Sequence, residues 1–418
     1  MGVLFNDVVI NKLSGGLGRR TPSKDMVSGL LFNISVALAE KTGKKVAKPK
    51  QVLEKDKVYR LASLKDAKAL GIDESYDVNG ISAFYQISQF FRMNPSGDLF
   101  IMASEEPNYS ALVENKVEEM LMKTNGDVRQ LAVIYNGATE FSELTRVVTH
   151  AKTVTEKAFE DFRPLEVILE GKGFDPKKVT DLGGFNAENV SVVIAMDKEV
   201  VATNANYNNT AAVGVLLGAV SKAKVSENIA WVEKFNLTGE GFRSVGFVGG
   251  KELLSEGQMK TLDEARYIFT RKHTGVPGVY FNDSHTCTQR SSDFAFIEAN
   301  RTINKAARIT RTALLPKLNS PVLVDPDTGK LAPTVVKGYE TLCKAALERM
   351  ISNEEVSEIE VYINPNQDIL ANSELQIEMS VVPMGTARRI IVNLGFKNPF
   401  QLKAVSVGAP APTPSPSN

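Results

Sequence analysis

Residues that could perform catalysis or bind a metal are few in this 418-residue chain, and they lie far apart in the sequence. The chain has three histidines, His150, His273 and His285. Only His285 lies close to a cysteine, in the run His285-Thr286-Cys287. A structural zinc site usually needs four such ligands, and no others stand at a suitable spacing. We therefore predict structural or surface roles for these histidines and no bound metal.

Two further runs contain residue types that bind phosphate or cations. The glycine-rich run 15–21 lacks the Gly-Lys-Ser/Thr ending of a phosphate-binding loop. Asp325 and Asp327 are not followed by the ligand spacing of a calcium-binding loop, so we expect a turn there. Cys343 falls on the apolar face of an expected helix and is expected in a core. The sequence thus predicts no catalytic residue, no cofactor and no enzymatic activity.

Charge is separated along the C-terminal part of a chain that has 49 basic and 49 acidic residues. Residues 291–317 are mainly basic, and residues 353–387 contain no lysine or arginine. The basic stretch carries Arg301, Lys305, Arg308, Arg311 and Lys317, and the acidic stretch carries Glu354, Glu355, Glu358, Glu360, Asp368, Glu374 and Glu378. A neutral chain with separate basic and acidic surfaces can attract its own copies. The overall balance argues against nucleic acid as the main partner.

The basic stretch has the apolar spacing of a helix. Its apolar stripe is Phe296, Ile303, Ala307, Thr310 and Leu314. We expect Ser291 or Ser292 as the N-cap and Pro316 close to the end. Two interpretations of the cations Arg301, Lys305, Arg308 and Arg311 remain open. They are either solvated or paired within the chain, or they form a face that docks on an acidic surface of a tube or a neighbouring subunit.

A layered module is expected to follow the basic helix. A second helix begins near Pro333, with an apolar stripe formed by Val336, Tyr339, Cys343, Leu347 and Met350. Three segments, 359–363, 374–381 and 390–396, then alternate apolar and polar residues and are predicted to be strands. Two helices on one face of a three-stranded sheet give a layered unit. The opposite face would carry Glu358, Glu360, Glu374 and Glu378 and would meet solvent or a partner.

The whole chain is predicted to be a mixed α/β protein in four parts. Residues 1–20 form an arm whose apolar residues are Val3, Leu4, Phe5, Val8, Val9 and Ile10. Residues 21–289 form a mixed α/β outer domain, residues 290–405 form the module, and residues 406–418 form an extended proline-rich tail. In the outer domain we expect helices at 25–40 and 210–223 and strands at 99–102, 131–135, 165–169, 190–195 and 279–281.

The order of several motifs resembles contractile tail sheath proteins, which surround the tails of myophages and of related headless injection particles. No single motif is diagnostic, but their joint order is specific. The matching runs in the module are Leu314-Leu315-Pro316, Thr328-Gly329-Lys330-Leu331, Ile363-Asn364-Pro365-Asn366-Gln367-Asp368, Val382-Pro383-Met384-Gly385 and Ile390-Ile391-Val392-Asn393-Leu394-Gly395-Phe396. Upstream, the similar runs are 61–72, 90–95 and 277–281.

The resemblance implies a structural subunit that polymerises helically around an inner tube and shortens to drive the tube through a target envelope. It implies partners: other copies of the chain, an inner tube protein, and baseplate and tail-terminator proteins. In that family, terminal strands complete a sheet in neighbouring subunits, which would be the role of the arm. A helix of the C-terminal module faces the tube, which would be the role of Arg301, Lys305, Arg308 and Arg311. No membrane insertion is implied.

Composition agrees with this interpretation. The chain is 43% hydrophobic and 23% charged, as globular proteins are, and it has two cysteines. Without a disulfide framework or a secretory leader, we expect assembly in a bacterial cytoplasm, as part of a phage tail or an injection particle. A non-contractile tube or ring protein is the main alternative. An α/β enzyme with an unrecognised site is a further alternative, which a cleft with converging titratable groups would indicate.

Overall fold

A computed structural model describes residues 24–34, 52–137, 139–239, 242–250 and 255–396. The described residues divide into two units, one that ends at residue 384 and one that begins at residue 385. Three sequence predictions lie outside the described residues. These are the arm with Val3, Leu4, Phe5, Val8, Val9 and Ile10, the glycine-rich run 15–21 and the proline-rich tail 406–418.

The first unit contains a six-stranded sheet in the order β2-β3-β1-β4-β5-β6. β2 is antiparallel to β3, and the other neighbours are parallel. The strands are β1 (Val27–Asn33), β2 (Val58–Leu61), β3 (Asp98–Ser104), β4 (Gln130–Ile134), β5 (Glu166–Glu170) and β6 (Val190–Val193). Two short antiparallel pairs accompany the sheet: β7 (Ala195–Met196) with β8 (Gly246–Phe247), and the hairpin of β9 (Thr270–His273) with β10 (Val276–Phe281).

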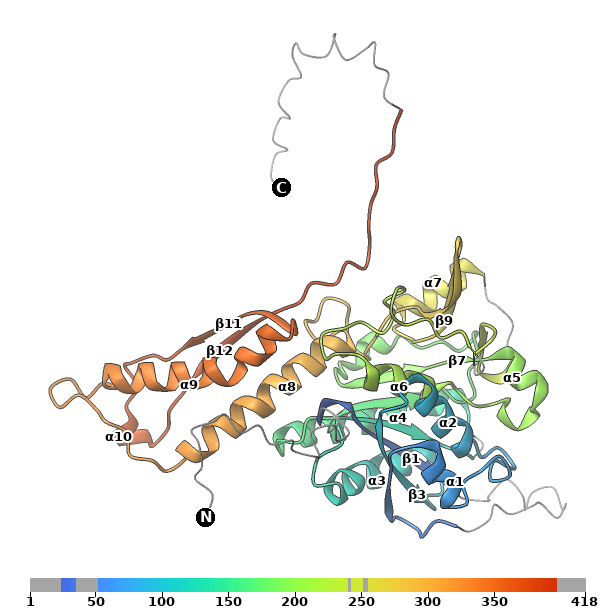
Figure 1. The fold of residues 1–418 in the computed structure, drawn as a ribbon, viewed down its shortest axis with the longest axis horizontal. Coiled ribbons are helices and arrows are strands. Elements are labelled where there is room, and N and C mark those ends of the chain that lie inside the picture. The colour runs from blue at the N-terminus through green and yellow to red at the C-terminus, as the bar shows by residue number, and fades with distance from the viewer. Residues whose placement is uncertain (1–23, 35–51, 138, 240–241, 251–254, 397–418) are drawn as a thin grey trace, which may run out of the picture. The chain divides into compact units, whose positions relative to one another are not determined.

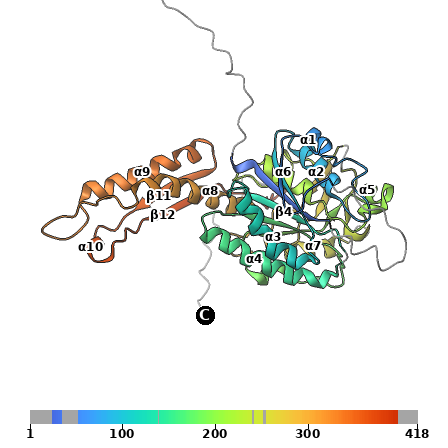
Figure 2. The same ribbon diagram turned by 90° about the horizontal axis from the view of Figure 1, so that it is seen from below.

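Helices cover both faces of this sheet, so the predicted mixed α/β class is confirmed (Figures 1 and 2). α3 and α4 pack together on one face, and α6 packs against β1, β4 and β5 on the other face, beside α2. The helices are α1 (Leu64–Ala69), α2 (Ala83–Met93), α3 (Tyr109–Lys123), α4 (Leu144–Glu160), α5 (Lys198–Thr203), α6 (Val213–Lys222) and α7 (Glu256–Glu264).

One predicted helix of this domain is wrong. Residues 25–40 were expected to be helical, but residues 24–26 form a short 3-10 turn and residues 27–33 form β1 in the middle of the sheet. All residues of β1 are buried. A central parallel strand is apolar on both faces, so its sequence lacks the alternation that separates a strand from a buried helix. The other expected strands and the helix within 210–223 are confirmed.

The contact between α2 and α6 depends on two glycines of α6. A Cβ atom added at Gly214 would overlap the backbone carbonyl of Gln86 in α2. A Cβ atom at Gly218 would lie 2.7 Å from the Cβ of Met93. The Gln86 side chain accepts a hydrogen bond from the backbone N–H of Gly214 (2.7 Å) and donates one to the carbonyl of Ala211 (2.6 Å). The two helices therefore meet backbone to backbone.

The C-terminal module of this unit is built from α8 (Ile297–Leu314), α9 (Pro333–Ser352), β11 (Val356–Tyr362) and β12 (Glu378–Pro383). The two strands are antiparallel, and the short α10 (Ile369–Asn372) lies between them in the sequence. The second helix is confirmed, and three residues of its predicted stripe, Cys343, Leu347 and Met350, pack with strand residues Ile359 and Val361 in a small core. The other two, Val336 and Tyr339, are only partly buried. The N-cap of α8 is Phe296, so the expected serine cap is wrong.

The prediction of a third strand in the module, at residues 390–396, is also wrong for the single chain. Within the described residues β11 and β12 pair only with each other, and residues 385–396 form no helix or strand. The alternating segment is exposed instead, with 80% of Ile390 and 94% of Leu394 accessible. Alternation predicts a half-buried strand only when a partner strand is present.

Candidate assembly surface

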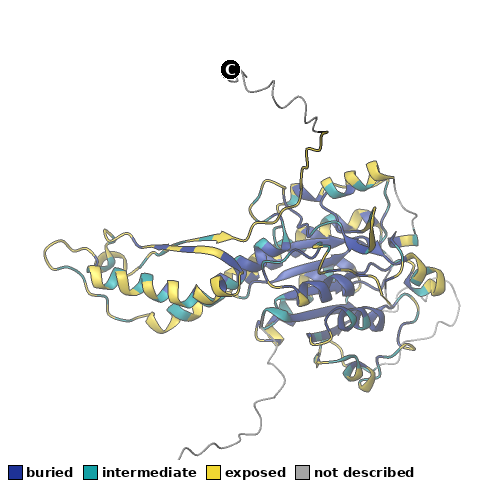
Figure 3. Cartoon of the chain, turned by 45° about the horizontal axis from the view of Figure 1, so that its top comes forward, coloured by how far each residue is buried: buried dark blue, intermediate teal, exposed yellow. Residues whose placement is uncertain are grey.

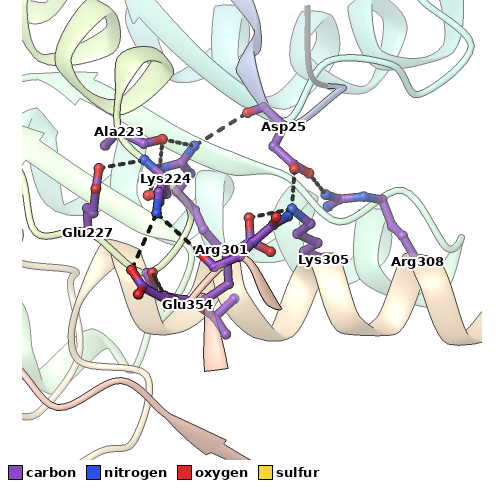
Figure 4. A network of polar contacts seen from close by, with 12 residues as sticks. Asp25, Ala223, Lys224, Glu227, Arg301, Lys305, Arg308 and Glu354 are labelled. Atoms are coloured by element: carbon purple, nitrogen blue, oxygen red, sulfur yellow. Dashed lines mark hydrogen bonds and ion pairs between the residues drawn. The ribbon is translucent and has the colours of Figure 1, made fainter. Parts of the chain in front are cut away.

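The basic helix α8 is joined to the start of β1 by a polar network (Figure 4). The carboxylate of Asp25 accepts bonds from Lys305 and Arg308, each at 2.7 Å. Lys305 also contacts Glu355, immediately before β11, at 2.7 Å. The network therefore links three places that are far apart in the sequence: the 3-10 turn that precedes β1, helix α8 and the entry to β11.

Arg301 is the most buried cation of this helix, with 5% of its surface exposed. Its guanidinium donates to the backbone carbonyls of Ala223, Lys224 and Asp25 at 3.2–3.4 Å. Burial lowers the pKa of Arg301 to about 10, partly offset by the charge of Asp25. The neighbouring Glu166 is also buried, and burial raises the pKa of its carboxyl well above the ordinary value, against the charge of Arg301.

A second set of contacts holds the module from the side of α6. Lys224, just after α6, donates to the carbonyl of Asn353 at 3.1 Å and lies 3.9 Å from the carboxylate of Glu354. Ser226 donates to the carbonyl of Glu354 at 3.2 Å. These groups are largely exposed, so each pair contributes little to stability. Together with the Asp25 network they fix the turn between α9 and β11 (Figure 4).

The cations predicted to form a docking face are therefore not equivalent. Arg301, Lys305 and Arg308 have partners inside their own chain, as the first of the two open interpretations expects. Arg311 is exposed and lies over the ring of Phe162, with its guanidinium carbon 4.1 Å from the ring centre. Sequence reasoning missed Asp25 as the shared partner, because no local pattern marks it. Contact of this helix with a tube or a neighbour stays a prediction.

Replacing Arg301 with methionine is expected to lower the free energy of unfolding by about 3 kcal/mol. The change removes the donor for three backbone carbonyls and removes the cation whose charge favours the ionised form of the buried Glu166. Arg311→Met on the same helix is the matched control and should cost less than about 0.5 kcal/mol, because its side chain is exposed. Urea unfolding measures both values. Equal losses in the two variants would contradict the assigned role of Arg301.

An acidic face lies on the other side of the module. Glu358 and Glu360 of β11 and Glu378 of β12 are exposed and share one face of the hairpin. Glu358 and Glu360 alternate with the buried Ile359 and Val361, and Glu378 pairs with Tyr362, which points to the same side as Glu360. Tyr362 and Val382 stand on the same face and are also exposed. Glu374 lies outside the strands and accepts a bond from Gln376 at 3.1 Å. The structure thus brings three of the four predicted carboxylates together.

The exposed apolar residues of the C-terminal segment follow this hairpin in the sequence. Ile390, Ile391, Val392 and Leu394 are each at least 68% exposed, and Figure 3 shows the segment in the exposed colour. Exposed large apolar side chains in succession are unusual and mark an interaction surface. The segment therefore has the composition of a strand but has no pairing partner among the described residues.

The residues considered for chemistry occupy structural positions. His285 is buried, with Nε2 2.9 Å from Asp263. Cys287 and Cys343 are buried, and burial raises the pKa of both thiols. Asp325 accepts from the backbone N–H of Asp327 and Thr328, as in the expected turn. Over the described ranges, no three His, Cys, Asp or Glu residues are grouped so as to hold a metal ion. None of the described helices is long and apolar enough to cross a bilayer.

The fold is that of contractile sheath proteins. The chain is similar to the helical sheath of the anti-feeding prophage in its contracted state (TM-score 0.59, 13% identity, covering 94% of this chain and 100% of that chain). It is also similar to the contracted sheath complex of an extracellular contractile injection system (TM-score 0.58, 13% identity, covering 96% of this chain and 99% of that chain). A chain of the anti-feeding prophage baseplate is similar as well (TM-score 0.58, 12% identity, covering 95% of this chain and 100% of that chain).

The chain belongs to the DUF2586 family. The N-terminal domain of that family matches residues 5–285, and its C-terminal domain matches residues 293–401. No curated protein matches the chain. At 12–13% identity the likeness to the solved sheath structures establishes a shared fold, and it extends over both the sheet domain and the module.

Proposed function

We propose that this protein is the subunit of a contractile sheath that polymerises helically around an inner tube. The observation that carries the proposal is the apolar segment 390–396, which alternates like a strand and is exposed next in sequence to a two-stranded sheet. Apolar strands with free backbone groups are stable when they add to the edge of another sheet. The similarity of the fold to sheath subunits over 94% of this chain supports the same conclusion.

Strand exchange between copies would join the subunits. The segment 390–396 of one copy would add to the β11–β12 hairpin of a neighbour, and the arm with Val3, Leu4, Phe5, Val8, Val9 and Ile10 would supply a further strand. Each net hydrogen bond contributes about 0.5–1.5 kcal/mol, so a strand of five paired residues ties two subunits together during large rotations. The two meeting surfaces differ, and such an interface extends into a helical array when the rotation does not close a ring.

The proposed activity is mechanical and not enzymatic. Contraction would be a collective switch between an extended and a shortened packing, with its energy stored when the sheath assembles, so no nucleotide or other cofactor is needed. The partners would be other copies of the chain, an inner tube protein, and baseplate and tail-terminator proteins. Assembly would take place in the bacterial cytoplasm, and the product would be a phage tail or a headless injection particle.

Negative-stain electron microscopy of the purified full chain, alone and with a co-expressed tube protein, tests this function. We expect thick cylinders in extended and shortened forms. A variant without residues 2–11 should remain folded by circular dichroism and form no cylinders, because it lacks the proposed arm. Smooth thin tubes or closed rings from the full chain would indicate a non-contractile protein and contradict the proposal. Normal cylinders from the truncated variant would contradict the proposed role of the arm.

A further inference from the structure

A groove of about 680 Å³ lies beside the basic helix and has no described occupant. Its walls are α8, Ala346 of α9, Asp25 before β1, the turn that follows α3 and the residues that follow α4. Five cations line it, against two carboxylates, Asp25 and Asp127. The cations are Arg129, Arg163, Lys305, Arg308 and Arg311.

The charges of this groove are not balanced within the described part of the chain. Lys305 and Arg308 are paired with Asp25. Arg129, Arg163 and Arg311 form no ion pair with a described carboxylate. The Nε of Arg129 is buried without a hydrogen-bond partner, although its Nη1 donates to the carbonyl of Gly126. Burial, together with the charge of Arg308, lowers the pKa of Arg129 to about 10. Crowded, partly desolvated cations of this kind favour an added anionic group.

The rim of the groove carries an aromatic residue in an unusual conformation. Phe162 follows α4 with φ at 61°, in the left-handed region, and 61% of it is exposed. The backbone N–H of Arg163 bonds to the carbonyl of Ala158 at 2.7 Å, which is the turn that normally ends a helix at a glycine. A bulky residue in that position is strained, and such residues concentrate at functional sites. The ring lies under the guanidinium of Arg311.

We propose that this groove receives the acidic face of the β11–β12 hairpin of a second copy of the chain. The inference rests on the proposed function, because it names two surfaces that meet when subunits polymerise. Glu358, Glu360 and Glu378 form no ion pair with a described cation of their own chain, and their negative charges complement the positive charges of Arg129, Arg163 and Arg311.

The geometry of the hairpin suits the groove. Glu358 and Glu360 stand two residues apart on one strand, so their side chains are about 7 Å apart, and Glu378 extends the same face across the ladder. Tyr362 and Val382, on that face, provide apolar surface for Phe162. A row of carboxylates with an aromatic side chain beside it favours a protein strand over a small free anion, which would leave Phe162 exposed.

Charge reversal and its compensation test the docking. The groove variant Arg163→Glu/Arg311→Glu and the face variant Glu358→Lys/Glu360→Lys should each raise the protein concentration required for assembly by at least about tenfold. The chain with all four changes should assemble within about threefold of the wild-type concentration. Arg271→Glu/Lys272→Glu, on the exposed β9–β10 hairpin, is the control and should assemble normally. Assembly is measured by sedimentation and electron microscopy.

Phe162→Gly separates docking from folding. Glycine relieves the left-handed strain, so the variant monomer should unfold at the wild-type temperature or above it, while assembly should need several times more protein. A groove variant that assembles at the wild-type concentration overturns the proposal. If the chain with all four substitutions stays unassembled, the proposal is also overturned, because another anion then occupies the groove.

A cross-link distinguishes failure of this inference from failure of the proposed function. If the full chain forms no cylinders, the sheath function fails. A mixture of Arg311→Cys chains and Glu360→Cys chains should still form an intermolecular disulfide on mild oxidation. The native Cys287 and Cys343 are buried and should not compete for this bond. Formation of that bond supports the docking, and absence of the mixed dimer rejects it.

Discussion

A chain without residues 385–418 is expected to unfold at the same temperature as the full chain, within about 2 °C, and to form no cylinders. The described residues of this segment are exposed and contribute nothing to the cores formed by residues 27–297 and 306–361. Their removal therefore leaves the packing of the first unit intact. It also removes the strand that we propose to join neighbouring subunits. Thermal unfolding and electron microscopy give the two results independently.

Substitutions within the segment sharpen this test. A paired strand buries one face, so Ile390→Ser/Val392→Ser/Leu394→Ser should prevent assembly, whereas Ile391→Ser on the opposite face should have a much smaller effect. Equal effects of the two variants would mean that the segment does not act as a half-buried strand. Normal cylinders from the truncated chain would remove the segment from the assembly altogether.

Replacing Gly214 with alanine is expected to lower the free energy of unfolding by about 2 kcal/mol. The added Cβ would overlap the carbonyl of Gln86, a backbone atom that cannot move without separating α2 from α6. It would also disturb the hydrogen bond between Gly214 and the Gln86 side chain. Urea unfolding followed by circular dichroism measures the loss.

The same substitution at Gly338 in α9 is the matched control. Gly338 is also inside a helix, but outside its chain neighbours and the backbone of its own helix no atom lies within 4 Å of its added Cβ. Alanine should stabilise that helix by about 0.5–1 kcal/mol, since it reduces the entropy lost on folding. Opposite signs at the two glycines are therefore the expected outcome. Stabilisation at both positions would show that α2 and α6 are not in backbone contact.

Sequence periodicity was sufficient where an element has one buried face. The stripe with Cys343, Leu347 and Met350 predicted α9, and alternation around Ile359 and Val361 predicted β11. It failed for β1, where every residue is buried and no polar face exists to reveal the period. It also could not show whether residues 390–396 have a partner, because alternation describes one strand and pairing requires two.

The candidate site was harder to predict, because it depends on contacts between distant residues. The hydrogen bond from Arg301 to Asp25 joins residues 276 positions apart, and no local pattern encodes it. The basic stripe was visible in the sequence, but which cations are neutralised depends on where Asp25 and Glu355 fold back onto α8. The groove was not predicted, since its walls come from five separate segments and Phe162 carries no sequence signal for its left-handed conformation.

The position of Asp25 also determines how the protein would bear load. A force applied through residue 24 reaches Asp25 first, and its bonds to Lys305 and Arg308 pass part of that force to α8 before β1 is loaded. β1 is bonded along its length to β3 on one side and β4 on the other, so tension along it shears both ladders at once rather than opening them bond by bond. Rupture in this geometry requires many hydrogen bonds to break together. The connection to β1 is therefore mechanically strong against tension directed along the strand.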